Sequence, residues 1–228
     1  MKPEVELIIE DVKEAIRNLK KNKAAGTDGI HLELIKYGGN KLLNRVCELI
    51  RQIWKEERIP EEWKETIIVP VHERGDRDRC ENYRGIALGN AAYKISSNIL
   101  LGKIKPYIEK VMGDYQNRFR DGRSVIHNMF ALKIINQKIR EYNQSVPYLF
   151  IDIQKAYDSI HRDAQWECMK EFKVPTKLIN MCKTYVQKTR SVVRIEGTLL
   201  LFSPKIKQAW NRVTLYQQYY LIWHYKKW

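Results

Sequence analysis

An apolar run with a single carboxylate inside it places the strongest constraint on how this chain folds. The run is YLFIDIQKAYDS, residues 148–159, and Asp152 stands among side chains that favour a buried strand. Because an unpaired carboxylate is very unfavourable in an apolar core, Asp152 needs a partner, and a metal ion is a leading candidate. An aspartate at a strand end also commonly forms a turn or caps a helix, so the run alone leaves both interpretations open.

The residues that follow Asp152 add groups suited to phosphate. The predicted turn presents the backbone N–H groups of Lys155 and Ala156 beside the Tyr157 ring. A carboxylate, backbone amides and an aromatic ring suit a metal-bound phosphate. Gln154 stands where Asp-dependent phosphatases need a second aspartate, which disfavours that class.

The charge of the chain indicates a polyanionic partner. The 228 residues include 41 Lys and Arg against 27 Asp and Glu, a formal net charge of +14. Nucleic acid is the first candidate and an anionic membrane surface the second, while a solvated basic face is the alternative. Arginines gather in two segments, HERGDRDRCENYRG and QNRFRDGRS, where they suit triphosphate or nucleic-acid phosphate; they are Arg74, Arg77, Arg79, Arg84, Arg118, Arg120 and Arg123.

Cysteine spacing and hydropathy favour an intracellular protein, cytoplasmic or nuclear. Cys47, Cys80, Cys168 and Cys182 lie far apart and match neither a zinc site nor a disulfide scaffold. The N-terminus MKPEVELIIEDVKEAI carries acids within its apolar pattern, unlike a signal peptide. No apolar run reaches the length of a membrane span, so we expect no membrane partner.

Apolar periodicity predicts an α+β fold with helices between short strands. Helices are expected at 12–19, 42–54, 86–108 and 125–142, one around Trp166 to Phe172 and one after Pro175. Strands are expected at 66–71 and around Asp152, and 190–207 is expected to form a hairpin turning at Glu196 and Gly197.

Six segments, read in order, resemble successive blocks of the reverse transcriptases of non-LTR (LINE-type) retrotransposons. They are NKAAGTDGI, PEEWKETIIVPVHERGD, ENYRGIAL, AAYKI, QNRFRDGRS and LFIDIQKAYDSI, and the resemblance covers residues 8–208. It implies the fingers and the first part of the palm of a right-hand polymerase. The expected division is a fingers-like region with N-terminal helices over 1–146 and a partial palm over 147–208, with an incomplete palm and no thumb.

The resemblance also implies a two-metal site. Asp152 would bind both catalytic Mg²⁺ ions, helped by the backbone carbonyl of Ile153. Two ions about 4 Å apart activate the primer 3′-hydroxyl and stabilise the leaving pyrophosphate. The implied partners are an RNA template, a DNA primer and deoxynucleoside triphosphates.

Five further residues acquire roles in nucleotide binding from the resemblance. The amides of Lys155 and Ala156 would face the triphosphate, and Tyr157 occupies the position that rejects ribonucleotides. Arg84 matches a fingers position that contacts the incoming nucleotide, and Arg74 matches the basic position before it. Arg120 and Arg123 are the candidate nucleic-acid contacts.

The chain departs from the family pattern at several positions. Glu73 stands where the family usually has a basic residue, Gly85 replaces a common proline, and Arg118 replaces a common glycine. The family supplies its second acid from a downstream Tyr-x-Asp-Asp turn. This sequence has no Asp-Asp pair, no aspartate after Asp163 and no acid after Glu196.

The last residues suggest why that acid is missing. KQAWNRVTLYQQYYLIWHYKKW replaces the expected glycine and Pro-Leu-Ser-Pro-like block. Read from the third base of the Thr214 codon, the genetic code permits Ser-Leu-Ser-Thr-Ile-Leu-Phe-Asn-Leu-Ala, which is that block in another frame. We hypothesise a frameshift near Gln208 to Trp210, which makes 209–228 an out-of-frame tail, expected to be poorly ordered. Base stacking by its tyrosines or an interfacial helix are the alternatives.

Two functions from different classes follow. The first is a reverse transcriptase fragment whose ancestral reaction adds deoxynucleotides to a 3′-hydroxyl on an RNA template, inactive here without its second acid. The alternative is a non-catalytic basic nucleic-acid-binding protein that retains the fingers. An unrelated metal-dependent phosphoryl-transfer enzyme would leave the ordered blocks unexplained.

Overall fold

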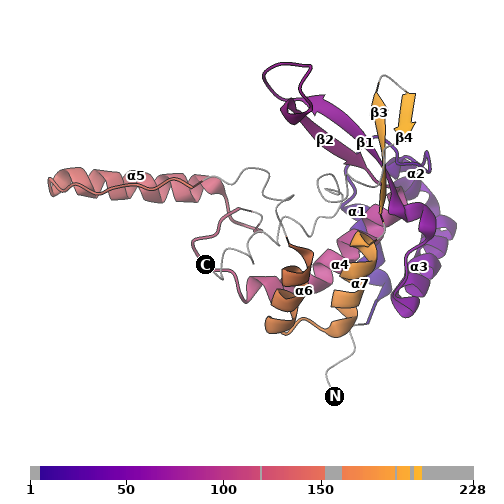
Figure 1. The fold of residues 1–228 in the computed structure, drawn as a ribbon. Helices are drawn as coiled ribbons and strands as arrows, with labels where there is room; N and C mark the ends of the chain where they lie inside the picture. Colours follow the sequence, from indigo (N-terminus) through magenta and orange to yellow (C-terminus); the bar gives the residue numbers. More distant parts are fainter. Residues whose placement is uncertain (1–5, 119, 152–160, 188, 196–197, 202–228) are drawn as a thin grey trace.

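A computed structural model describes residues 6–118, 120–151, 161–187, 189–195 and 198–201 (Figure 1). The helices are α1 (Ile9–Arg17), α2 (Leu32–Tyr37), α3 (Gly39–Glu56), α4 (Ala91–Glu109), α5 (Val125–Glu141), α6 (Arg162–Glu171) and α7 (Thr176–Val186). The strands are β1 (Glu65–His72), β2 (Tyr83–Leu88), β3 (Arg190–Ile195) and β4 (Thr198–Leu201), with 3-10 turns η1 (Glu61–Lys64) and η2 (Cys80–Asn82). This mixture confirms the predicted α+β class.

Most of the core lies between helices. In α1 the buried side chains Val12, Ala15 and Ile16 follow the three- and four-residue spacing of one helix face. The Asp11 carboxylate accepts a hydrogen bond from the Ile8 backbone N–H at 2.9 Å, which helps to begin the helix. α3 buries Val46, Cys47, Ile50, Ile53 and Trp54 in the same way.

Helix α4 is the centre of this core, in contact with α1 and with α7. Ile95 and Leu100 are completely buried, and the helix also buries Tyr93, Ile99, Ile104 and Ile108. Because buried residues recur around the helix rather than along one stripe, α4 is covered on more than one side.

The four strands form one sheet in the order β2-β1-β3-β4. β1 and β2 are antiparallel, with Val69 opposite Ile86, and β3 and β4 are also antiparallel. β1 and β3 are parallel, with Ile67 opposite Val192. The sheet thus joins a strand from the predicted fingers-like region to one from the predicted partial palm, whose division at residue 146 stays a prediction.

Several elements confirm the sequence predictions, and three segments differ from them. α1, α3, α5, α6 and α7, the strand at 65–72 and the 190–201 hairpin lie where periodicity indicates. Residues 86–88, expected to begin a helix, instead end β2, because their backbones pair with Ile67, Ile68 and Val69. The short helix α2 was not predicted, since six residues hold too few periods to stand out.

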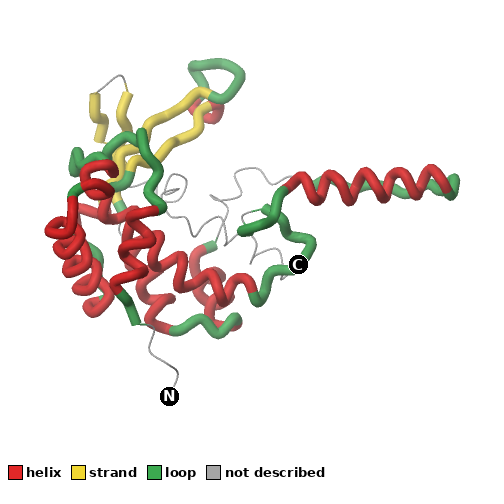
Figure 2. The backbone as a smooth tube through the Cα atoms, turned by 180° about the vertical axis from the view of Figure 1, so that it is seen from behind, coloured by secondary structure: helices red, strands yellow, loops and turns green. Residues whose placement is uncertain are grey.

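Helix α5 projects away from the rest of the molecule (Figures 1 and 2). It has no buried residue, although it carries seven exposed apolar side chains: Val125, Ile126, Met129, Phe130, Leu132, Ile134 and Ile135. The helix begins with the Ser124 hydroxyl accepting from the Ile126 N–H at 3.2 Å. Among the described residues, no surface therefore covers the apolar side chains of this helix.

The apolar run before Asp152 differs most from expectation. Residues 144–151 form no strand, and Leu149, Phe150 and Ile151 are 85%, 80% and 78% exposed. The expectation of a buried strand is wrong for this part of the run, because no described strand pairs with it and a lone strand satisfies neither its backbone nor its apolar side chains. The Tyr148 hydroxyl donates to the Asn136 side chain of α5 at 2.9 Å, and the Tyr148 ring stacks on Phe150.

None of the described helices combines the length and apolar character that crossing a bilayer requires.

Candidate functional site

The predicted site residues fall into two groups. Arg74, Arg84, Arg120 and Arg123 lie within the described residues. Asp152, Ile153, Lys155, Ala156 and Tyr157 lie outside the described residues. The geometry of the predicted site is therefore that of its arginines.

The first two arginines belong to the β1–β2 hairpin, whose tip is held by backbone contacts. The Asn82 side chain donates to the Asp76 carbonyl at 2.7 Å, and the Glu73 N–H donates to the Asn82 carbonyl at 2.9 Å. Gly75 has φ of +78°, and a β-carbon there would lie 2.7 Å from the Asn82 amide nitrogen. The positive φ favours glycine at this turn, and a β-carbon there would displace the Asn82 side-chain amide.

The hairpin has a balanced charge rather than a purely basic one. Residues 72–84 include four arginines and four acids, which are Glu73, Asp76, Asp78 and Glu81. Arg84 Nε lies 2.6 Å from the Glu73 carboxylate, and both side chains are exposed. Arg74 is also exposed at the tip. The two candidate nucleotide contacts therefore share one solvent-facing hairpin, but one of them already has an anionic partner.

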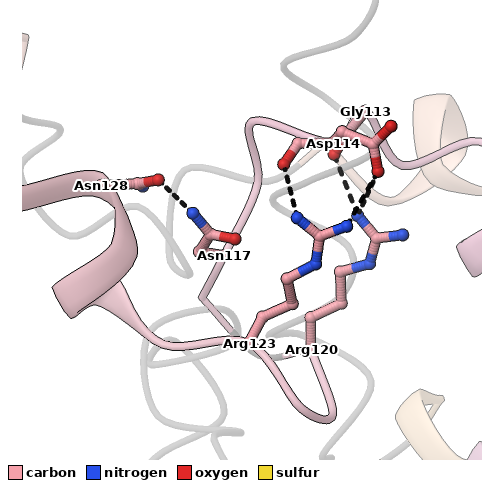
Figure 3. Close-up of polar contacts among 6 residues, drawn as sticks. All are labelled: Gly113, Asp114, Asn117, Arg120, Arg123 and Asn128. Carbon is pink, nitrogen blue, oxygen red and sulfur yellow. Dashed lines mark hydrogen bonds and ion pairs between the residues drawn. The ribbon is translucent and has the colours of Figure 1, made fainter. Parts of the chain in front are cut away.

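The second pair of arginines folds back onto the loop before α5 (Figure 3). Arg120 donates to the Gly113 carbonyl at 3.1 Å. Arg123 donates to the Asp114 carbonyl at 3.2 Å and to its carboxylate at 3.0 Å, while Arg120 lies 3.8 Å from the same carboxylate. Asp114 thus gathers both guanidinium groups. Their contacts with Gly113 and Asp114 help to fix the loop before α5.

This loop also carries a buried asparagine, Asn117. The Asn117 side-chain amide donates to Asn128 on α5, and its own carbonyl oxygen Oδ1 is buried without a hydrogen-bond partner among the described residues (Figure 3). A buried acceptor without a partner is unfavourable. This contact ties the loop to the first turn of α5 and so couples the arginine loop to that helix.

The sequence reasoning missed a junction of three family-like blocks around Asn90. The Asn90 side-chain oxygen accepts from the Thr27 hydroxyl at 2.8 Å, and its amide donates to the Glu62 carbonyl at 3.3 Å. The Asp28 carboxylate accepts from the Ala91 N–H at 3.3 Å and so caps α4. Through Thr27 and Asp28, the segment NKAAGTDGI fixes the start of α4. We call this contact between residues 26–28 and Asn90 the brace.

Gly26 was the signal that could have located this brace. A β-carbon at Gly26 would lie 2.6 Å from the Asn90 backbone nitrogen, so the two segments touch at backbone distance. Close to this contact, burial lowers the pKa of Lys94, and the Asp28 carboxylate opposes that shift. The Asp28 carboxylate thus also compensates part of the cost of burying the Lys94 charge.

The metal prediction is not tested by this geometry. In the part of the chain that the structure covers, no three His, Cys, Asp or Glu side chains gather into a possible metal site. Asp152, the predicted ligand, lies outside that part. The described residues by themselves therefore offer no set of oxygen donors that fits Mg²⁺.

With the fold and arginine geometry in place, comparison with known proteins assigns the class. Residues 71–214 match the family described as "Reverse transcriptase (RNA-dependent DNA polymerase)". The match covers the tip of the β1–β2 hairpin, β2, the arginine loop, the Asp152 stretch and the β3–β4 hairpin. Because it spans more than half of the chain, the chain belongs to the reverse transcriptase family.

Individual relatives specify the type of element. The chain is similar to the transposon TX1 uncharacterized 149 kDa protein of Xenopus laevis, 20% identical over 209 residues, which are 90% of this chain and 16% of that protein. It is 24% identical over 199 residues to the probable RNA-directed DNA polymerase from transposon X-element of Drosophila melanogaster, 83% of this chain and 21% of that protein. A putative 115 kDa protein in the type-1 retrotransposable element R1DM of the same species is 25% identical over 157 residues, 68% of this chain and 15% of that protein.

The domain is thus a LINE-type reverse transcriptase domain, as the sequence predicted. The chain spans between 15% and 21% of the length of these relatives.

Proposed function

We propose that this chain carries the nucleotide-binding fingers and the first catalytic motif of an RNA-directed DNA polymerase. The observation that carries the proposal is the family match over residues 71–214, which includes both the arginine hairpin and Asp152. In this proposal Arg74 and Arg84 contact the triphosphate of an incoming deoxynucleotide. Arg120 and Arg123 contact the backbone of an RNA template or a DNA primer.

The proposed chemistry at Asp152 is a two-metal transfer of a nucleotide to a primer 3′-hydroxyl. When bound, Mg²⁺ ions would stabilise the charge on the attacking and leaving oxygens. Asp152 and the Ile153 carbonyl would hold them, the Lys155 and Ala156 amides would bind the triphosphate, and Tyr157 would exclude a ribose 2′-hydroxyl. Within these 228 residues the resemblance assigns only one carboxylate to such a site, and no acid follows Glu196.

We further propose that the 228-residue chain alone does not polymerise, and that the frameshift removed its Tyr-x-Asp-Asp turn. The test is primer extension on an RNA template with deoxynucleotides and Mg²⁺, beside an Asp152→Asn control. We expect the same background for both chains. Synthesis by the unmodified chain that Asp152→Asn abolishes would overturn the proposal.

Nucleotide sequence tests the frameshift separately. Genomic DNA and transcript should be sequenced across the codons for Gln208 to Leu215. A stop-free second frame encoding Ser-Leu-Ser-Thr-Ile-Leu-Phe from the Thr214 codon would support the shift. Codons that do not permit this peptide would contradict it.

The second candidate is a non-catalytic nucleic-acid-binding protein, favoured by the net charge of +14 and the exposed arginines of the hairpin. It predicts RNA binding that weakens steeply as salt rises, because bound cations are released from phosphates. Salt-dependent binding without synthesis would favour this candidate. For either function we propose an intracellular setting, cytoplasm or nucleus, where template and nucleotides occur.

A further inference from the structure

On the β1–β2 hairpin, Glu73 forms an ion pair with Arg84, a proposed nucleotide contact. Glu73 stands where the family usually has a basic residue. Glu73 lies just after β1, and Arg84 lies near the start of β2. The Glu73 N–H is bonded to the Asn82 carbonyl, which fixes the glutamate two residues from Arg84 across the hairpin. Its carboxylate oxygen Oε1 lies 2.6 Å from Arg84 Nε.

We propose that Glu73 lowers the affinity of the hairpin for phosphate by occupying Arg84. This inference rests on the proposed function, in which Arg84 contacts the triphosphate of the incoming nucleotide. A phosphate that reaches Arg84 either displaces the carboxylate or approaches it closely, and both are unfavourable. Glu73 therefore weakens anion binding at this position.

Exposure makes this contact a competitor rather than a structural support. The Arg84 and Glu73 side chains are 59% and 44% exposed. Exposed ion pairs contribute little to folding stability, because water screens the attraction and both side chains lose freedom. A phosphate carries more charge than a carboxylate and accepts several hydrogen bonds from a guanidinium, so it competes for the same donors. Removing Glu73 should consequently change binding without unfolding the hairpin.

The hairpin offers a matched control at Asp78. Asp78 is exposed on the same turn, and its backbone N–H donates to the Asp76 carboxylate at 3.0 Å. The described residues include no ion pair between the Asp78 carboxylate and Arg84. Asp78→Asn thus removes one negative charge from the hairpin, as Glu73→Gln does, but leaves the Glu73–Arg84 contact in place.

The experiment measures binding of inorganic tripolyphosphate to the full 228-residue chain by titration calorimetry. The set contains the unmodified chain, Glu73→Gln, Asp78→Asn, Arg84→Gln and the Glu73→Gln/Arg84→Gln double variant. We expect Glu73→Gln to raise the affinity about three- to fivefold and Asp78→Asn by less than about 1.5-fold. In the Arg84→Gln background, Glu73→Gln should have no such effect. Thermal unfolding by circular dichroism checks that every variant is folded.

The outcomes separate the inference from the proposed function. If Arg84→Gln weakens binding but Glu73→Gln does not strengthen it, the inference is overturned and the role of Arg84 stands. Equal gains from Glu73→Gln and Asp78→Asn would also overturn it, because overall charge would then explain the change. If Arg84→Gln leaves binding unchanged, or no chain binds tripolyphosphate, the proposed nucleotide contact fails and the inference fails with it.

Discussion

The hydroxyl groups of Ser96 on α4 and Tyr185 on α7 share a hydrogen bond within the helical core. Both residues are almost completely buried, and the Tyr185 ring lies 5.2 Å from that of Tyr93. Tyr93 in turn meets the edge of Trp63, beside the start of β1. A polar contact inside this aromatic group fixes how α7 packs on α4, and through Trp63 it reaches the base of the hairpin.

Replacing Tyr185 with phenylalanine tests that contact. Tyr185→Phe keeps the ring but removes the partner of the buried Ser96 hydroxyl, so we expect a loss of about 1–3 kcal/mol in the free energy of unfolding. Adding Ser96→Ala should cost less than the sum of the two single changes, since it removes the unpaired hydroxyl. Urea unfolding of the unmodified chain, the two single variants and the double variant measures this double-mutant cycle. Additive effects would mean that the two hydroxyls do not stabilise one another.

Stability should fall at alkaline pH. Burial raises the pKa of the Tyr93 and Tyr185 hydroxyls and of the Cys182 thiol well above their ordinary values of 10.0, 10.0 and 9.0. Above those ordinary values the unfolded chain loses these protons, whereas the folded chain keeps them. The unfolded state then binds fewer protons, so the free energy of unfolding decreases by up to about 1.4 kcal/mol per pH unit for each group.

Urea unfolding from neutral pH to above the ordinary tyrosine pKa measures this decrease. Tyr93→Phe removes one titrating group and should make the decrease shallower. Tyr115→Phe, at an exposed position, is the control and should leave the slope unchanged. A slope that Tyr93→Phe does not alter would contradict the assignment to this residue.

Two glycines should respond in opposite directions to alanine. Gly26→Ala would bring a β-carbon to 2.6 Å from the Asn90 backbone nitrogen and should destabilise the chain by about 1–3 kcal/mol, since backbone gives way less easily than a side chain. Gly102 lies in α4 with nothing within 4 Å of an added β-carbon. Gly102→Ala should stabilise by about 0.5–1 kcal/mol, because alanine favours helix. Melting temperatures that move in the same direction would contradict the brace at Asn90.

Charging the apolar side chains of α5 should leave folding intact. Ile126 and Phe130 are 69% and 61% exposed, so Ile126→Lys with Phe130→Lys removes no core packing. We expect an unchanged melting temperature and less self-association by light scattering, because exposed apolar surface promotes aggregation. Ile99→Lys, at a buried position of α4, is the contrasting control and should unfold the chain. A large loss of stability from the α5 changes would show that this helix packs on the rest of the protein.

Sequence patterns predicted local structure well and long-range structure poorly. The spacing of Val46, Ile50 and Ile53 located α3, and the apolar run TIIVPV located β1, because both signals lie within one element. The parallel pairing of β1 with β3 joins residues such as Ile67 and Val192, which no local pattern links. The exposure of α5 was hidden for a similar reason, since its apolar residues look the same whether or not another surface covers them.

For the candidate site, the sequence predicted which arginines are present but not which acids they contact. The arginines of both segments were identified, yet a basic loop read along the sequence does not reveal that Asp114 holds Arg120 and Arg123. Glu73 was recognised as a departure from the family pattern, but its contact with Arg84 depends on the turn that aligns the two arms of the hairpin. The family itself was predictable, because the order of its blocks is carried by the sequence alone.

The parallel alignment of β1 with β3 has a consequence for synthesis on the ribosome. Ile68 pairs with Val193, so β1 cannot pair with β3 until 125 more residues have been synthesised. At ordinary translation rates that interval lasts about 6–25 s. During it, β1 has β2 on one side and an open row of backbone donors and acceptors on the other, which can recruit a strand from another nascent chain. The sheet therefore gives this polypeptide a period of vulnerability to misassembly that the finished molecule no longer has.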